Sequence, residues 1–284
     1  MVPPTGGLFY CMLRLSFISV LVFIVSIAGA QELYVFTNPA SNIPAKAIAA
    51  KLSMKTMKPY HYVNRREYRM MPEVQVGISK KIMLTAAGSF SNMFFEEGMR
   101  FESARLYAKY RFYSKDDVHK HFRAAAFAAG AWSNNPLVYQ ELNLDGDNSG
   151  VQAGVLATQL VNKFAATAGV SYIRQLEKKD KLFLGLPFSN EGLQYNLSMG
   201  YLLLPRSYTS YNQTNFNLYC EFLGLRNTDI SRSYLDIAPA VQFIFKSSTR
   251  VNLGARYQLA GNAHRMAKQS YFISLEHYFL NALK

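Results

Sequence analysis

The sequence has few cysteines and no long apolar stretch in its main part. Cys11 and Cys220 are the only cysteines among 284 residues. Cys11 precedes the point where we expect a signal peptide to be removed, so the mature chain keeps one cysteine. That excludes a disulfide framework or a cysteine metal site within one mature chain. After residue 31, no apolar run approaches the roughly 20 residues that a transmembrane helix needs.

Acidic residues are also scarce. The chain carries 18 Asp and Glu against 31 Lys and Arg, for a formal net charge of +13. A solvated basic surface, contact with lipid phosphates and an anion-attracting interior are all compatible with this balance. The cations are spread through strands and loops rather than gathered in one patch, so we expect no nucleic-acid partner.

The first 30 residues have the pattern of an export signal. Arg14 precedes the apolar run Leu15–Ile27, and Ala28-Gly29-Ala30 offers small residues for cleavage after Ala30. A single membrane anchor is the alternative. Residues 31–44 contain Asn38-Pro39, which is turn chemistry, and we interpret them as a periplasmic lead-in or a partial plug.

Strict alternation of side-chain character dominates the rest of the chain. In the fourth segment, Leu106, Ala108 and Tyr110 alternate with Tyr107 and Lys109. A period of two predicts a strand, because successive side chains point to opposite faces. Twelve such segments occur: Ala45–Lys55, Pro72–Ser79, Ile82–Met93, Ala104–Tyr113, Lys120–Ser133, Gly150–Val161, Lys163–Gln175, Gly192–Leu204, Asn215–Leu225, Tyr234–Lys246, Arg250–Leu259 and Ser270–Phe279.

Strand and loop lengths favour a barrel in a bilayer over a soluble sandwich. Several segments have 10–13 residues, whereas strands of soluble proteins average about 5–6 and tilted membrane strands need roughly 9–11. Long and short connections alternate along the chain, as in outer-membrane barrels. Pro205–Thr214 is the exception. We predict residues 45–284 to be one all-β, antiparallel up-and-down barrel of about 12 strands, and a secreted β-sandwich is the weaker alternative.

The last strand carries the most specific resemblance. Its aromatic and apolar residues alternate up to a final aromatic, and the chain resembles the outer-membrane β-barrel proteins of Gram-negative bacteria, whose assembly machinery reads such a pattern. The residues that fit are Tyr271, Ile273, Leu275 and Phe279. The tail Leu280–Lys284 departs from that family, where the aromatic residue usually ends the chain. The opening Leu33–Lys46 resembles uncharacterised Bacteroidetes barrels. The resemblance implies an outer-membrane location.

The polar faces of the strands supply the candidate lumen. Charged side chains inside a barrel pair with one another or line water, so the set fits either a hydrated channel or a closed, salt-bridged structural barrel. Inward glycines Gly77, Gly154, Gly169, Gly200 and Gly254 favour the channel by leaving room. The candidate lumen residues are Glu73, Arg105, Lys109, Arg111, Gln152, Gln194, Asn196, Asn217, Glu221, Asp236 and Arg256.

The first long connection is rich in cations. Arginine forks match phosphate oxygens, so an outer loop of this kind could bind lipopolysaccharide; a solvated loop is the alternative. The candidates are Lys58, Arg65, Arg66 and Arg69.

Enzymatic and metal chemistry find little support. A Ser/His/Asn arrangement of outer-membrane phospholipases is missing, because none of the five His precedes a Ser-Asn pair on a strand. Asp145-Gly-Asp147 begins like a calcium loop, but Leu156 occupies the position of the final carboxylate. We therefore expect no enzyme, cofactor or metal, with a lipid-modifying enzyme as the weaker alternative. The expected partners are outer-membrane lipids, lipopolysaccharide, the barrel-assembly machinery and a small polar or anionic solute.

Overall fold

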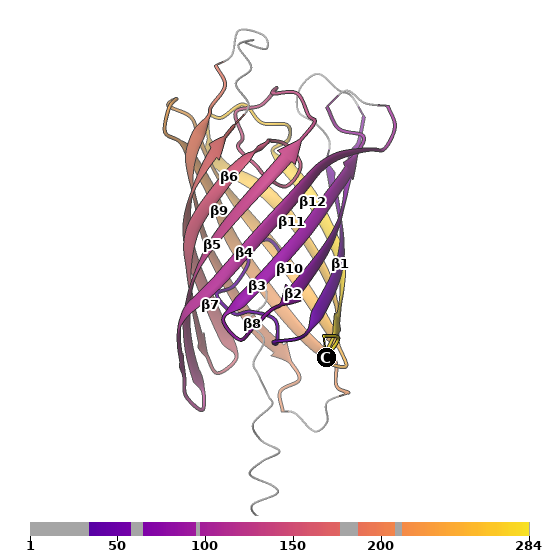
Figure 1. Cartoon of the computed structure of the whole chain (residues 1–284), viewed down its shortest axis with the longest axis vertical. Coiled ribbons are helices and arrows are strands. Elements are labelled where there is room, and N and C mark those ends of the chain that lie inside the picture. The colour runs from indigo at the N-terminus through magenta and orange to yellow at the C-terminus, as the bar shows by residue number, and fades with distance from the viewer. Residues whose placement is uncertain (1–33, 58–64, 95–96, 177–186, 208–211, 284) are drawn as a thin grey trace, which may run out of the picture. The chain divides into compact units, whose positions relative to one another are not determined.

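The chain folds into a closed barrel, seen in a computed structural model that describes residues 34–57, 65–94, 97–176, 187–207 and 212–283. Neighbouring strands pair antiparallel in sequence order, and β12 returns to β1. The twelve strands are β1 Ile48–Met57, β2 Glu67–Gly77, β3 Ile82–Ser91, β4 Arg100–Asp116, β5 Lys120–Ser133, β6 Gly150–Val161, β7 Phe164–Gln175, β8 Glu191–Leu204, β9 Asn215–Asn227, β10 Ser233–Phe245, β11 Thr249–Gly261 and β12 Gln269–Phe279. The predicted fold class is confirmed (Figure 1).

Closure leaves no open sheet edge among these strands. β1 pairs with β12 from Ile48 opposite Phe279 to Met57 opposite Ser270. An unpaired backbone group in hydrocarbon costs several kcal/mol, and ring closure removes that cost. Within the described ranges, no helix reaches the length and hydrophobicity needed to cross a bilayer.

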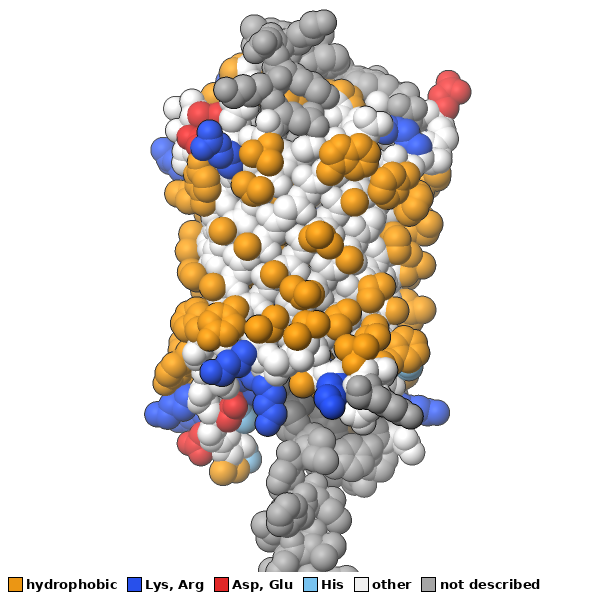
Figure 2. All heavy atoms as spheres, in the orientation of Figure 1, with side chains coloured by type: hydrophobic (Ala, Val, Ile, Leu, Met, Phe, Trp, Pro, Cys, Tyr) orange, Lys and Arg blue, Asp and Glu red, His pale blue; other side chains and the backbone are white. Residues whose placement is uncertain are grey.

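Each strand turns an apolar face outward. On β12, Tyr271, Ile273 and Leu275 are 42–53% exposed, whereas Ser274 and Glu276 between and beyond them are buried. Figure 2 shows the result on one face: hydrophobic side chains cover the middle of the barrel, and charged side chains gather towards its two ends. An exterior of this kind matches hydrocarbon flanked by polar headgroups.

The two ends of the barrel differ in their connections. The six connections that follow odd-numbered strands lie at one end, which we call the long-loop end, and the other five lie at the short-turn end, close to the C-terminus (Figure 1). Even the exceptional segment 205–214 is a connection at the short-turn end, and its described residues form no strand. The strand count from the sequence is therefore right at this position.

The largest difference in strand boundaries is at β2. This strand begins at Glu67, five residues before the predicted Pro72. Glu67 and Arg69 point inward, where they are 1% exposed. Tyr68 between them and Met70 after them lie on the outer face. Charged residues in this stretch look like a loop in the sequence, but they are the inward half of a strand.

Two chain segments enter the barrel from opposite ends. Residues 34–44, here called the N-terminal segment, precede β1 and lie at the short-turn end. Residues 134–149, here called the inward loop, connect β5 to β6 at the long-loop end. Both bury apolar side chains, including Tyr34, Val35 and Ala40 in the first and Leu142 and Leu144 in the second. These segments, rather than wall side chains alone, fill the interior.

Candidate functional site

Arg69 attaches the inward loop to the barrel wall. This side chain lies on β2, and its guanidinium forms ion pairs with Glu102 of β4 and with Asp147 of the loop, the latter with 2.5 Å between Nη2 and Oδ1. Glu102 also accepts hydrogen bonds from Ser91 Oγ at 2.5 Å and Asn135 Nδ2 at 2.7 Å. One buried carboxylate thus joins three strands to the start of the loop.

Gly146 gives the loop room to reach Arg69. Its φ of +120° lies in a region that L side chains rarely adopt. A Cβ at this position would lie 2.6 Å from both Arg69 Cζ and Glu102 Oε1. Glycine is therefore required here both for its backbone conformation and for the close packing of the ion pair.

Arg265 forms a second charged cluster on the other side of the interior. This residue belongs to the connection between β11 and β12, and it contacts both carboxylate oxygens of Glu141, at 2.9 and 3.0 Å. It also binds Asp236 of β10 at 2.7 and 2.9 Å. Arg256 of β11 pairs with Asp236, and Tyr234 stacks its ring 3.7 Å from Arg265 Cζ.

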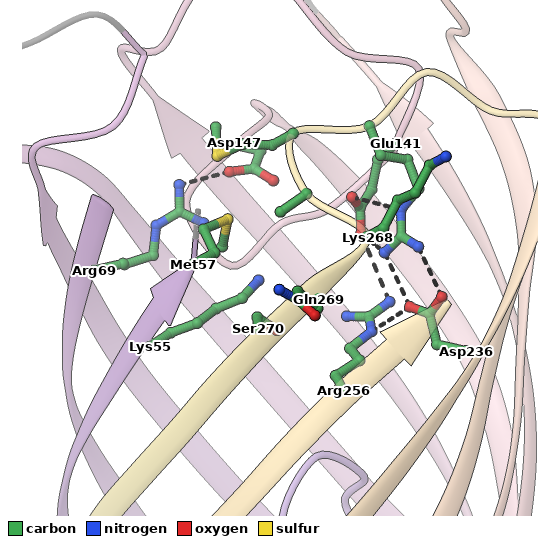
Figure 3. A pocket seen from close by; sticks show the side chains of 13 residues that line it. Lys55, Met57, Arg69, Glu141, Asp147, Asp236, Arg256, Lys268, Gln269 and Ser270 are labelled. Atoms are coloured by element: carbon green, nitrogen blue, oxygen red, sulfur yellow. Dashed lines mark hydrogen bonds and ion pairs between the residues drawn. The ribbon is translucent and has the colours of Figure 1, made fainter. Parts of the chain in front are cut away.

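A pocket separates the two clusters (Figure 3). It has a cavity volume of about 20 Å³ and is partly open to solvent. Five of its lining side chains are cationic and three are carboxylates, so positive charge is in excess. The lining residues are Lys55, Met57, Arg69, Glu141, Asp147, Asp236, Arg256, Arg265, Met266, Ala267, Lys268, Gln269 and Ser270.

The loop carboxylates respond differently to this environment. Burial acts to raise the pKa of Glu141, but the neighbouring Arg265 and Arg256 outweigh it and hold that pKa well below its usual range. For Asp147, burial prevails over the attraction of Arg69 and Lys55, and its pKa is raised. Glu141 therefore remains ionised at a pH where an ordinary glutamate has taken up a proton.

Glu221 of β9 holds the beginning of the N-terminal segment. Its Oε1 accepts hydrogen bonds from the backbone N–H groups of Val35 and Phe36, at 3.0 and 2.9 Å. Ser198 of β8 donates to the other carboxylate oxygen and also contacts Thr37, with 2.9 Å between the two hydroxyl oxygens. The wall thus binds this segment largely through its backbone.

Three further strands hold the rest of the N-terminal segment. Lys109 Nζ on β4 donates to the carbonyl oxygens of Pro39 and Ser41, both at 2.7 Å. The backbone N–H of Ala40 donates to Thr158 Oγ1 on β6 at 2.8 Å, and Arg123 on β5 donates to Ser41 Oγ. A segment that contacts so many strands of a closed barrel lies inside it.

Inward glycines accommodate chain atoms instead of leaving a free lumen. A Cβ on Gly77 would lie 2.1 Å from the carbonyl oxygen of Pro44, and one on Gly254 would lie 3.2 Å from the Phe36 ring. A Cβ on Gly200 would lie 2.4 Å from the ring of Tyr219. A Cβ on Gly154 would lie 2.4 Å from Ser171 Cβ, and one on Gly169 would lie 2.5 Å from Asn196 Oδ1. The expectation that these glycines leave room for a pore is wrong, because the N-terminal segment and large wall side chains occupy that room.

Five charged residues of the predicted lumen set bind the two internal segments or line the pocket. Lys109 and Glu221 hold the N-terminal segment, as described above. Asp236 and Arg256 line the pocket. Arg105 forms an ion pair with Asp145 of the inward loop.

The remaining predicted lumen residues lie apart from the pocket. Gln152 Nε2 donates to Gln194 Oε1 at 2.8 Å, and Gln194 in turn donates to the carbonyl oxygen of Leu142 in the inward loop. The other four have mostly local neighbours: Glu73 accepts from Gln75, Asn217 donates to Gln242, Arg111 donates to the carbonyl oxygen of Lys80, and Asn196 packs beside Gly169.

The predicted lipopolysaccharide contacts separate into inside and outside positions. Arg69 is 1% exposed in the interior, so it is not available to an outer phosphate; the reason is the earlier start of β2. Arg66 is exposed, and Arg65 donates to the carbonyl oxygen of Asn92 at 3.2 Å. Lys58 lies outside the described residues.

The candidate calcium loop has other partners. Asp145 and Asp147 pair with Arg105 and Arg69 of the wall, and no group of three or more potential metal ligands occurs among the residues that the structure describes. The candidate assembly residues Tyr271, Ile273, Leu275 and Phe279 all face outward on β12. Beyond them, the backbone N–H of Leu283 donates to the carbonyl oxygen of Lys46.

Three important residues of the site were missed from the sequence: Lys55, Glu141 and Arg265. A signal for Lys55 exists, because Lys51, Ser53 and Lys55 alternate with outward Leu52 and Met54. Glu141 and Arg265 belong to connections, where alternation gives no information about direction.

Solved structures with the same architecture are outer-membrane proteins. The chain is similar to an outer membrane channel from Pseudomonas putida F1, with a TM-score of 0.56 and 12% identity over 87% of this chain and 100% of that one. It is also similar to the NanC porin, with a TM-score of 0.50 and 10% identity over 81% and 98% of the two chains. No protein-family model and no curated protein matches the sequence. At these identities the likeness establishes the barrel fold.

Proposed function

We propose that the protein is an outer-membrane channel for small polar or anionic solutes, with the N-terminal segment as an internal closure at its periplasmic end. The observation that carries this proposal is the pocket at the long-loop end, which is continuous with solvent and has more cations than carboxylates. Positive charge in a low-dielectric entrance attracts and concentrates small anions. The protein acts as a passive conduit and catalyses no reaction.

The exterior supports the membrane location. Exposed apolar side chains surround the middle of the barrel, and they would make a soluble protein aggregate. The predicted signal peptide accounts for export, and it would place the N-terminal segment and the short turns in the periplasm. The long loops then face outward, where Arg65 and Arg66 are in position to meet lipopolysaccharide phosphates. The outward aromatic pattern of β12 is the part offered to the assembly machinery.

The N-terminal segment supports a closable interior. Its covalent connection to the strands is the one to β1, so the segment can move without breaking any strand pair. Among its wall contacts, Lys109 donates to its backbone carbonyl groups, and Glu221 and Thr158 accept from its backbone N–H groups. Water can replace each of these hydrogen bonds. A displaced segment would leave a passage lined by those polar side chains.

A structural barrel without a through-passage is the second candidate. It is favoured by the many wall groups that bind the two internal segments, since they give a solid cross-section in the structure described. Single-channel recording on the refolded protein in planar bilayers separates the two. We expect discrete conductance steps with anion preference. Absence of steps at either polarity, in protein whose folding is shown by heat-modifiable gel mobility, would leave the structural role.

A further inference from the structure

Lys55 is a pocket cation with no ion-pair partner among the described residues. Its side chain rises from β1 and its ammonium points into the space between the Arg69–Asp147 pair and Arg256 (Figure 3). Its charged neighbours are Arg256, Glu141, Arg69 and Asp147. No hydrogen bond or ion pair joins Lys55 Nζ to another described residue.

Each carboxylate of the pocket already has a guanidinium partner. Glu141 receives two hydrogen bonds from Arg265, and Asp147 pairs with Arg69 at 2.5 Å. Asp236 is shared by Arg256 and Arg265. The arginine fork of Arg265 binds both oxygens of Glu141 and of Asp236 and holds these two carboxylates in place. Asp147 is held by Arg69 through one oxygen and accepts from Asn143 Nδ2 through the other. The Lys55 ammonium therefore has no ion pair with any of the three pocket carboxylates.

β12 adds neutral groups beside this ammonium. Gln269 and Ser270 line the same pocket, and Ser270 is the register partner of Met57 at the end of β1. A hydroxyl is a hydrogen-bond donor that suits a small anion, whereas Gln269 lies on the exposed face of β12 with Tyr271. The cavity volume of about 20 Å³, partly open to solvent, suits one small ion.

We infer that Lys55, with the Ser270 hydroxyl, forms a binding site for a small monoanion, a carboxylate or a halide, at the outer mouth of the barrel. The inference rests on the proposed function and names the place where an entering solute is first held. The Lys55 ammonium lies between the Arg69 and Arg265 clusters, whose arginines and carboxylates pair with one another. One unpaired ammonium at this point favours a ligand with one negative charge over a ligand with two. The surrounding carboxylates repel a second anionic group.

The test measures chloride binding. Its readout is the NMR line width of chloride in solutions of the detergent-refolded protein. We expect saturable broadening that acetate reverses. Lys55→Met should abolish it. Lys51→Met is the matched control, because Lys51 also points inward from β1 but has Glu73 and Glu276 as its cross-strand neighbours. This variant should retain the broadening.

Each result decides the inference. Equal broadening by wild type and Lys55→Met, or no saturable broadening by folded wild type, overturns it. Broadening that acetate fails to reverse overturns the carboxylate part and assigns the site to halides. Binding is measured without a bilayer, so a protein that binds chloride at Lys55 yet conducts nothing would refute the channel and leave the site standing.

Discussion

The two internal segments are held in chemically different ways. At the long-loop end, the inward loop offers its own carboxylates to arginines: Asp145 and Asp147 to the wall, and Glu141 to Arg265 of the connection between β11 and β12. At the short-turn end, the N-terminal segment offers mainly backbone groups, and the wall supplies the charges of Lys109 and Glu221. Opposite charges meet at the first end, whereas charges meet neutral groups at the second.

This difference predicts a fixed constriction and a movable one. Separating a buried ion pair leaves two charges without partners, which costs more than replacing a neutral partner by water. The inward loop is also tied at both of its ends, to β5 and β6, but the N-terminal segment is tied only to β1. The comparison teaches that the same wall holds one segment as part of the structure and the other as a removable insert.

The largest expected effect is at the fixed end. Arg69→Met leaves Glu102 and Asp147 without their guanidinium in the interior. Removing one partner of a buried ion pair costs about 3–5 kcal/mol, so the free energy of unfolding should fall by about that amount. Urea unfolding of the refolded protein in lipid vesicles measures it.

Arg105→Met provides the matched control for this substitution. Arg105 also pairs with a loop carboxylate, but the Asp145 side chain is 52% exposed. Exposed pairs contribute about 0–1 kcal/mol. Equal losses in the two variants would contradict the distinction between buried and solvated loop anchors.

The next effect concerns the movable end. Removing residues 34–44 should raise the single-channel conductance several-fold, because the segment fills the short-turn half of the interior. Planar-bilayer recording measures the change. Unchanged conductance in a correctly folded deletion variant would show that these residues do not limit passage.

A disulfide gives the converse test in the full-length segment. Thr37→Cys with Ser198→Cys places two thiols where hydroxyl oxygens are 2.9 Å apart, in a chain that begins at residue 31 and carries Cys220→Ser. Oxidation should hold the channel closed, and reduction should restore opening. Openings that continue with the disulfide formed would refute the role of the segment as the closure.

A smaller effect is expected for Glu221→Gln. The amide keeps one oxygen acceptor for the N–H groups of Val35 and Phe36 but loses the negative charge. Neutral hydrogen bonds are weaker than charge-assisted ones, so the segment should be held less tightly by about 1 kcal/mol. Faster amide hydrogen exchange at these two residues, with exchange in β9 unchanged, is the readout. Equal exchange rates would contradict the assignment of Glu221 as an anchor.

The smallest effect is the pH response of the fixed end. Because the folded-state pKa of Glu141 is depressed by Arg265 and Arg256 after burial is overcome, its contribution to stability is complete above the unfolded value of about 4.3. The contribution is lost as pH falls through the lower, folded-state pKa. Amide exchange in residues 140–144 should therefore be unchanged between pH 7 and pH 5 after correction for intrinsic rates. Glu141→Gln should remove the loss seen in stronger acid, and an onset above pH 5 would contradict this.

The sequence predicts the wall well and the contents poorly. Period-two alternation depends on neighbours two residues apart, so it identifies all twelve strands without knowledge of their partners. The ion pairs of the inward loop join residues far apart: Arg69 meets Glu102 across 33 positions and Asp147 across 78. No local pattern distinguishes such a buried charge from a solvated one. The sequence alone therefore predicts Arg69 in an outer loop, although its side chain lies inside the barrel.

The N-terminal segment illustrates the same limit from the other direction. Asn38-Pro39 correctly excludes a strand, and the alternatives of lead-in and plug follow from that alone. Its internal position depends on Glu221, Thr158 and Lys109, which the sequence marks only as inward polar residues. Inward glycines mislead in a similar way, because a missing side chain does not show what occupies its place.

The contacts of the N-terminal segment also constrain the order of assembly. Val35 and Phe36 are bound by a carboxylate 186 and 185 positions later in the chain. Contacts of such long range form late, because a large loop must close first. Val35 and Phe36 therefore wait without their carboxylate partner until the ninth strand has taken its place.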